Sequence, residues 1–130
     1  FWAKARLADE LCGFNTHGFD LPFLIRRSWM IGVQVPDKMR LENDRWWPHW
    51  NIDLRKIWQL GDPNAHGKLD VIAKALGLAG KTGECGKDFG KLWRADRAVA
   101  EAYLRQDVLL CAALHERMRF LGAKENNEHD

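Results

Sequence analysis

Hydrophobic residues recur every three or four positions along much of the chain, which is the spacing of helices that bury one face. Two residues mark helix starts: Pro22 falls in the first turn of a helix, where its missing N–H costs nothing, and Asp96 can cap the last helix. Gly32 and Gly77 follow helical stretches and are expected to end them. The predicted helices cover residues 1–11, 19–31, 68–76 and 96–120.

Strand signals are few. Residues 11–15 form a short apolar run that closes in a turn over 15–18, and residues 51–60 are predicted to begin as a strand and continue as a helix. The stretches 32–50 and 79–91 lack a periodic pattern and are predicted to be a Trp-rich loop and a Gly/Lys-rich loop. So many helices with so few strands would be unusual for a complete α/β domain.

Composition limits the class of protein. The 130 residues, 46% hydrophobic and 29% charged, suit one soluble globular domain, which we place at residues 1–121 with a polar tail at 122–130. A net charge of +2 excludes an extended basic arm but not a local basic face. No apolar run reaches the roughly 18 residues of a membrane span, and because the first residues fit an amphipathic helix we expect no signal peptide there. Cys12, Cys85 and Cys111 form no Cys-x-x-Cys pair, so we expect reduced thiols, a cytoplasmic location and no membrane partner.

Several familiar sites are excluded by spacing. Gly77 and Gly80 precede Lys81 and Thr82, but two residues separate the glycines where a phosphate loop needs four, and a helix precedes them instead of a strand. The five histidines are scattered without zinc spacing, and no Gly-x-Ser-x-Gly occurs. An ATP site, a zinc site and a serine hydrolase are therefore not expected.

Two clusters have a functional and a structural interpretation. Trp46, Trp47 and Trp50 can stack on unpaired bases or fill a loop against the core, and the structural interpretation is favoured. The basic residues that follow residue 80 can contact a nucleic-acid backbone, or they can form a solvated loop with the acidic residues among them. These basic residues are Lys81, Lys87, Lys91, Arg94 and Arg97.

Two segments carry candidate chemistry. Residues 13–24 place a strand, a tight turn and then Asp20 at the start of a helix, so its carboxylate would lie at the edge of a sheet, where active sites of open α/β sheets occur. Asp20 alone would be interpreted as a helix N-cap. Tyr103 and Asp107 are four residues apart on one face of the last helix, and alone they would be interpreted as an ordinary surface or core contact.

Taken together, the two segments resemble the second and third motifs of the DEDD 3′–5′ exonucleases, in the tyrosine subclass. Asn-x-x-x-Phe-Asp stands at residues 15–20 and Tyr-x-x-x-Asp at residues 103–107. The stretch 13–24 is similar to the proofreading domain of family-B DNA polymerases, and closer to predicted stand-alone exonucleases related to that domain. The likeness covers about residues 1–120 and implies an α/β, ribonuclease-H-like fold, of which this chain is a helix-rich C-terminal portion with an incomplete sheet.

The resemblance implies hydrolysis of phosphodiester bonds at nucleic-acid 3′ ends by two divalent ions, Mg²⁺ or Mn²⁺, held by four carboxylates. By position, Asp107 would bind the ion beside the attacking water and Asp20 the second ion, while Tyr103 would orient the water. Asn15 and Phe19 would line the cleft for the terminal nucleotide. The implied partner is a single-stranded 3′ end, of DNA in preference to RNA.

The first motif of that family, Asp-x-Glu, does not occur in the chain. The nearest matches are Asp9-Glu10, which lacks the spacer, and 42–44 and 128–130, which run in the reverse order. We therefore expect that the chain lacks the first strands of the domain. Because two carboxylates alone bind Mg²⁺ weakly, we also expect the chain by itself to be inactive or nearly so.

Two other functions stay open beside the nuclease. One is a non-catalytic module that binds nucleic acid on a degenerate nuclease fold. The other is a helical interaction domain in which both motifs are coincidental. A shared site requires the Asp20 and Asp107 carboxylates to lie within about 10 Å of each other, since paired ions lie roughly 4 Å apart.

Overall fold

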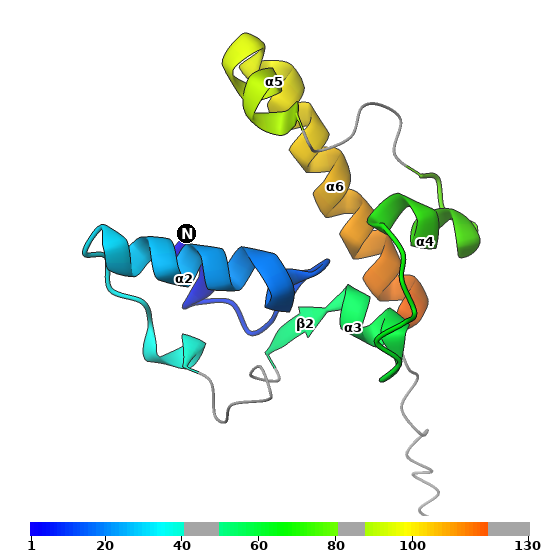
Figure 1. Cartoon of the computed structure of the whole chain (residues 1–130), viewed down its shortest axis with the longest axis horizontal. Coiled ribbons are helices and arrows are strands. Elements are labelled where there is room, and N and C mark those ends of the chain that lie inside the picture. Colours follow the sequence, from blue (N-terminus) through cyan, green and yellow to red (C-terminus); the bar gives the residue numbers. More distant parts are fainter. Residues whose placement is uncertain (41–49, 81–87, 120–130) are drawn as a thin grey trace, which may run out of the picture.

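The computed structural model describes residues 1–40, 50–80 and 88–119 (Figure 1). Its elements alternate short helices with two strands and end in one long helix. In chain order they are α1 (Trp2–Ala5), β1 (Leu11–Gly13), the π-helical turn η1 (Thr16–Asp20), α2 (Leu21–Met30), the 3₁₀ turn η2 (Asp37–Met39), β2 (Asn51–Asp53), α3 (Leu54–Gln59), α4 (Leu69–Ala75), α5 (Phe89–Ala95) and α6 (Arg97–Met118).

The two strands form a parallel pair. Leu11 lies opposite Asn51, and Gly13 lies opposite Asp53. The pairing extends one residue before β2, because the Leu11 N–H donates to the Trp50 carbonyl over 2.8 Å. Parallel strands run in the same direction, so both carboxyl ends lie at one edge of the sheet. The η1 turn and the β2–α3 junction both start from that edge.

Two hydrophobic clusters hold the elements together. One joins α3, α4 and α6 through the buried side chains of Leu54, Leu69, Ile72, Ala73, Leu110 and Leu114. The other joins α1, α2, η2 and the start of β2 through Ala5, Leu21, Met39 and Trp50. Each strand adds a partly buried residue, Ile52 to the first cluster and Leu11 to the second. The short sheet therefore links two small cores.

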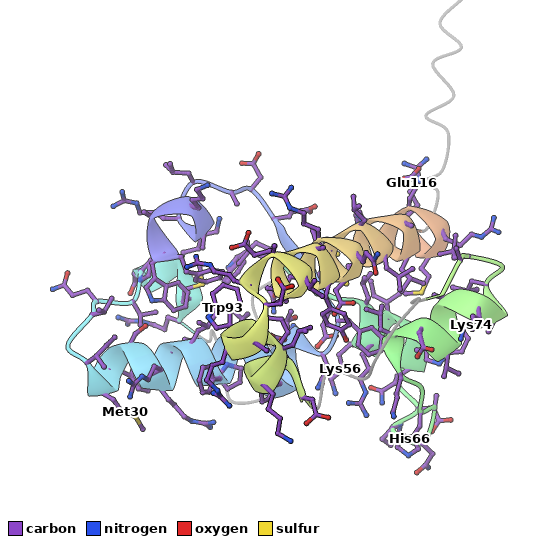
Figure 2. All side chains as sticks on the ribbon, turned by 90° about the horizontal axis from the view of Figure 1, so that it is seen from above. Met30, Lys56, His66, Lys74, Trp93 and Glu116 are labelled. Atoms are coloured by element: carbon purple, nitrogen blue, oxygen red, sulfur yellow. The ribbon has the colours of Figure 1, made fainter. Side chains whose placement is uncertain are left out.

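The long helix α6 connects the parts of the described chain. It packs against β1, α3, α4 and α5. Figure 2 shows it running across the molecule from beside Trp93, on α5, to Glu116 near its end. Its buried and half-buried positions follow helical spacing, so a single face looks inward. These positions are Ala100, Tyr103, Asp107, Leu110, Cys111, Leu114, His115 and Met118.

Most of the elements expected from the pattern are confirmed. The helices over 19–31 and 68–76 appear as α2 and α4, and residues 51–60 do start as a strand and continue as a helix. The Asp96 side chain accepts a hydrogen bond from the Val99 N–H over 3.1 Å, as expected for the cap of α6. Trp50 is buried in the second cluster, in agreement with the structural interpretation of that residue.

The predicted helix over residues 1–11 is wrong beyond its first turn. The helix α1 ends at Ala5, and Leu7 is left 79% exposed. Two effects favour the break: Asp9 and Glu10 would oppose the negative end of a longer helix dipole, and Leu11 must be extended to pair with β2. The turn expected over 15–18 is also different, since it forms the single π-helical turn η1.

The predicted Gly/Lys loop over 79–91 is wrong at its end, where α5 begins at Phe89. Gly90 lowers the intrinsic helix propensity of this segment, which hid the helix from the pattern. Packing of α5 along α6 offsets that cost, and the Phe89 ring lies 6.0 Å from Trp93 and 6.2 Å from Tyr103 between ring centroids.

The fold class is confirmed in its coarse form: the described chain is a helix-rich α/β arrangement with a small parallel sheet of two strands. The ribonuclease-H-like assignment stays a prediction.

Within the described ranges no helix is long and apolar enough to cross a membrane. Several residues named from the sequence lie outside these ranges: Trp46, Trp47, Lys81, Lys87, Cys85 and the tail 122–130.

Candidate active site at the carboxyl edge of the sheet

The turn that follows β1 is tied to β2 by one carboxylate. Asp53, the last residue of β2, is 3% exposed. Its Oδ1 accepts the backbone N–H of Asn15 over 2.8 Å, and its Oδ2 accepts the backbone N–H of His17 over 3.0 Å. The Arg55 N–H also donates to Oδ1, over 3.0 Å, which caps α3. One buried side chain therefore fixes both segments that leave the sheet edge.

The side chains of Thr16 and His17 add further links to β2. The Thr16 hydroxyl donates to the side-chain oxygen of Asn51 over 3.4 Å. The His17 Nε2 lies 3.3 Å from the Asn51 carbonyl oxygen, and because a carbonyl can only accept, the proton of this contact is on Nε2. Asn51 is buried, so these bonds are shielded from water.

The close packing of the segment from Gly13 to Asp20 explains why small residues occupy several of its positions. Asn15 adopts the left-handed conformation, φ 60°, which asparagine tolerates better than most residues. A Cβ on Gly18 would come within 2.5 Å of the Asn15 side-chain oxygen, and one on Gly13 within 2.5 Å of the Thr16 methyl group. The turn is therefore tightly packed as well as hydrogen-bonded.

Phe19 and Asp20 leave this turn on its exposed side. Phe19 is 63% exposed, and its ring stacks on that of Phe23 with centroids 6.1 Å apart. Asp20 occupies the N-cap position of α2, but its side chain makes no capping hydrogen bond. The N-cap interpretation therefore does not account for the carboxylate of Asp20.

Burial and the charge of Asp53 shape the electrostatics of this edge. Partial burial of the carboxyl group raises the pKa of Asp20, its own backbone amide lowers it, and the negative charge of Asp53 raises it further. Burial also lowers the pKa of His17, an effect that Asp53 opposes. The pKa of the Cys12 thiol is raised by burial and by Glu10 and Asp53, so this thiol stays protonated and is a poor nucleophile.

The lowered pKa of His17 predicts a loss of stability in mild acid. The unfolded chain takes up a proton on His17 near its ordinary pKa of 6.5, whereas the folded chain resists that proton, so the free energy of unfolding falls as the pH drops below about 6.5. Urea unfolding at pH 7.5 and 5.5 should show a larger loss for the wild type than for His17→Gln. An equal loss in the two proteins would mean that His17 does not carry this pH dependence.

The second predicted motif lies on the inward face of α6. Tyr103 and Asp107 are both half-buried, and the Oδ1 atom of Asp107 is shielded from solvent. Tyr103 packs its ring against Phe89 of α5. Further along the same face, Leu110 and Leu114 belong to the cluster against which Phe14, the residue after β1, packs. Tyr103 and Asp107 therefore precede the part of α6 that belongs to this cluster by one to three helical turns.

The five predicted site residues therefore lie on two segments beside the two-stranded sheet: η1 contacts β2, and α6 contacts β1. Asn15, Phe19 and Asp20 follow the carboxyl end of β1, and Tyr103 and Asp107 lie on the face of α6 that packs toward β1. The charged neighbour that acts on the carboxyl group of Asp20 is Asp53. Asp53 is not among the residues predicted from the sequence, although an acidic residue between a predicted strand and a predicted helix is a usable signal.

Two basic residues of the predicted cluster, Lys91 on α5 and Arg97 on α6, are engaged locally. Lys91 lies 3.5 Å from Asp88, and Arg97 pairs with Glu101 over 3.0 Å. The Arg97 guanidinium also lies 4.7 Å from the centre of the Trp93 ring. These contacts favour the interpretation of a solvated surface for this part of the predicted basic cluster.

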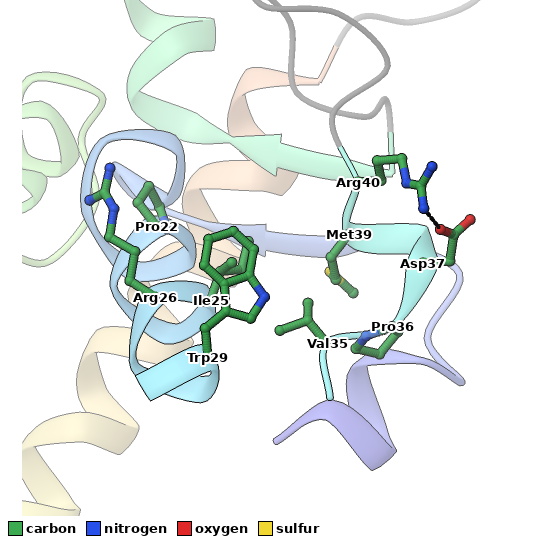
Figure 3. Close-up of a pocket in the computed structure, with 9 residues that line it drawn as sticks. All are labelled: Pro22, Ile25, Arg26, Trp29, Val35, Pro36, Asp37, Met39 and Arg40. Atoms are coloured by element: carbon green, nitrogen blue, oxygen red, sulfur yellow. Dashed lines mark ion pairs between the residues drawn. The ribbon is translucent and has the colours of Figure 1, made fainter. Parts of the chain in front are cut away.

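A cavity of about 510 Å³ lies between α2 and the segment around η2 (Figure 3). Pro22, Ile25 and Trp29 of α2 line one wall, and Val35 and Met39 face them. Asp20 precedes Pro22 by two residues, about 200° around a helix. The cavity therefore opens on the other side of α2 from the carboxylate of Asp20, and we do not assign it to this site.

The carboxylate oxygens of the candidate site are the ligand type that hard cations prefer, but too few of them lie in the described part of the chain to complete a metal site. Carboxylate oxygens are the ligands preferred by Mg²⁺ and Mn²⁺. Among the residues that the structure describes, no group of three or more His, Cys, Asp or Glu side chains converges to hold a metal ion. Asp20 and Asp107 are therefore the two candidate ligands that this part of the chain offers, and they do not make a complete site.

The chain resembles known proteins at the level of a protein family. Neither the curated proteins nor the solved structures contain a match. One family model matches residues 1–129, which is almost the whole chain, and it describes a predicted 3′–5′ exonuclease related to the exonuclease domain of PolB. The chain belongs to this family of predicted 3′–5′ exonucleases.

Proposed function

We propose that the protein is a 3′–5′ exonuclease, which hydrolyses phosphodiester bonds at the 3′ ends of nucleic acids with residues 1–121 as its domain. Membership of the family supports this reaction class. The single observation that supports placing the active site at these residues is the position of the Asp20 carboxylate. Its carboxylate stands on a tightly packed turn at the carboxyl edge of the sheet and caps no helix. Open α/β sheets place their ligands at such an edge.

The proposed cofactors are two divalent ions, Mg²⁺ or Mn²⁺, with Asp20 and Asp107 among their ligands. When bound, such ions lower the pKa of a water molecule and stabilise the charge that develops on the phosphate. The Oδ1 atom of Asp107 is shielded from solvent, which strengthens the attraction of that carboxylate for a cation. The four-carboxylate site of the resemblance includes two acids that Asp20 and Asp107 do not supply, so we expect weak binding by these two alone.

The remaining site residues have roles in binding and orientation. The phenol of Tyr103, one helical turn from Asp107, would hold the attacking water by a hydrogen bond. Phe19 offers an exposed ring on which the terminal base can stack, and base stacking tolerates any sequence. Asn15 sets the conformation of the turn and lines the same edge. The proposed substrate is a single-stranded 3′ end, DNA in preference to RNA.

The test is the cleavage of a single-stranded oligonucleotide labelled at its 5′ end, in DNA and RNA versions, with Mn²⁺ or Mg²⁺. We expect slow, stepwise shortening that leaves a ladder of labelled products and stops when EDTA removes the ion. The rate should be low, because two carboxylates hold the ions weakly. An oligonucleotide whose last linkages are phosphorothioates is the matched control and should resist shortening.

Three results would contradict the proposal. Products that arise by internal cuts would indicate an endonuclease. Cleavage that continues in EDTA would indicate a reaction without divalent ions, or a contaminant. The two carboxylates present should still support trace cleavage when high Mn²⁺ and long incubation offset their weak binding of the ions. Binding of the oligonucleotide without any shortening under those conditions would favour the non-catalytic module that binds nucleic acid.

A further inference from the structure

The contacts of Asp53 exceed those of a helix cap. A cap at the start of α3 needs only the bond from the Arg55 N–H, which an asparagine, serine or threonine can also accept. The other two bonds come from Asn15 and His17, which are 38 and 36 residues away in the sequence. They reach different oxygens of the carboxylate, so both oxygens must be acceptors.

Only a carboxylate meets that requirement in a side chain of this size. An asparagine at position 53 would keep one accepting oxygen but would present an NH₂ group, a donor, to one of the two backbone N–H groups. Burying a carboxylate is unfavourable unless it is hydrogen-bonded, and here three backbone donors compensate for the lost water. A buried carboxyl group therefore stands where a neutral cap would suffice for the helix.

We propose that Asp53 is a positioning residue for the hydrolysis: its carboxylate holds the turn over residues 15–20 in the register that directs Phe19 and Asp20 toward the substrate. The proposal rests on the proposed function, because it assigns the turn to the reacting edge. Asn15, in its left-handed conformation, and His17 are the points of attachment. Phe19 and Asp20 follow within three residues of His17 and within one turn of η1.

The proposal separates local positioning from general stability. If Asp53 only stabilised the fold, its loss would loosen every part of the molecule. If it positions the turn, its loss frees the turn while α6 keeps its own cap at Asp96 and its own core contacts. The distinction matters for catalysis because a misplacement of about 1 Å can reduce a rate by about 100-fold.

The decisive variant is Asp53→Asn, which keeps the volume of the side chain. We expect amide hydrogen exchange of Asn15 and His17 to accelerate at least about tenfold, while the central amides of α6 keep their wild-type rates. In the cleavage assay, kcat should fall by about 10- to 100-fold because Asp20 loses its alignment. KM should rise by a smaller factor, because the exposed ring of Phe19 can still stack on Phe23 and on a base even when the turn is loosened. Asp96→Asn is the matched control, an identical change at the cap of α6, and should leave both the turn and kcat unchanged.

Two results would overturn the proposal: an equal acceleration of exchange throughout the chain, or unchanged exchange at Asn15 and His17. If Asp53→Asn does not fold, the wild type still gives an answer. Scalar couplings through the hydrogen bonds from the Asn15 and His17 amides to the Asp53 carboxylate should be detectable by NMR, and their absence would refute the positioning role. If the wild type shows no cleavage, the proposed reaction fails, and exchange at the turn alone decides the role of Asp53.

Discussion

Replacing Asp107 by asparagine is expected to abolish 3′-end cleavage, with a loss greater than about 100-fold. Removing a residue that only hydrogen-bonds to a metal ligand typically lowers metal affinity or activity by about 10- to 100-fold. Asp107 is proposed as a direct ligand, so its loss should reduce the rate by more than that. The change removes one negative charge and replaces one oxygen donor by an NH₂ group, while the volume of the half-buried side chain is kept. The measurement is the initial rate of shortening of the labelled oligonucleotide at saturating Mn²⁺.

Binding of the ion gives a second readout that does not require turnover. Mn²⁺ should broaden the NMR signals of the turn over 15–20 and of α6 around Asp107 in the wild type, and should do so at higher concentrations in Asp107→Asn. Asp70→Asn is the matched control, because Asp70 lies on α4, pairs with Lys74 over 3.3 Å and has no proposed role. Wild-type cleavage by Asp107→Asn would exclude Asp107 from the site.

Replacing Leu114 by alanine is expected to cost about 3 kcal/mol of unfolding free energy, within the range of buried Leu→Ala changes. Leu114 is 0% exposed and packs in the cluster that joins α6 to α3 and α4. Because the described chain has only small cores, a loss of this size is a large share of the 5–15 kcal/mol typical of domains. Urea unfolding, followed by circular dichroism, measures the change.

Leu109→Ala is the matched control on the same helix. Leu109 is 68% exposed, so the same truncation removes little buried surface and should change stability by less than about 0.5 kcal/mol. The two variants have the same composition and nearly the same helix propensity. Equal losses in both would mean that α6 does not face the core with Leu114.

The parts of the site that the sequence predicted correctly are those defined by local periodicity. Tyr103 and Asp107 share a face because four residues make about one helical turn, and that holds whatever the helix packs against. Asp20 falls at the start of α2 because Pro22 restricts where the helix can begin. In each case the residues that determine the local structure lie within a few positions of each other in the sequence.

The parts that were missed depend on contacts between distant segments. Asp53 could be identified as a residue at a strand end, but its partners Asn15 and His17 are almost 40 residues away. The helix α5 contains Gly90 and is stabilised by packing on α6, which no local pattern reveals. The early end of α1 likewise follows from the pairing of Leu11 with β2. Sequence patterns record propensity, whereas these features are set by tertiary contacts.

The bond between Asn15 and Asp53 also has a consequence for the order in which the protein folds. It closes a loop of 38 residues, and the entropic cost of bringing such ends together is about 3 kcal/mol. Helices such as α6 need only neighbouring residues and can form within microseconds, but the carboxyl edge of the sheet cannot exist until β2 has docked beside β1. A nascent or partly folded chain would therefore hold much of its helical structure while the proposed nuclease edge is still unformed.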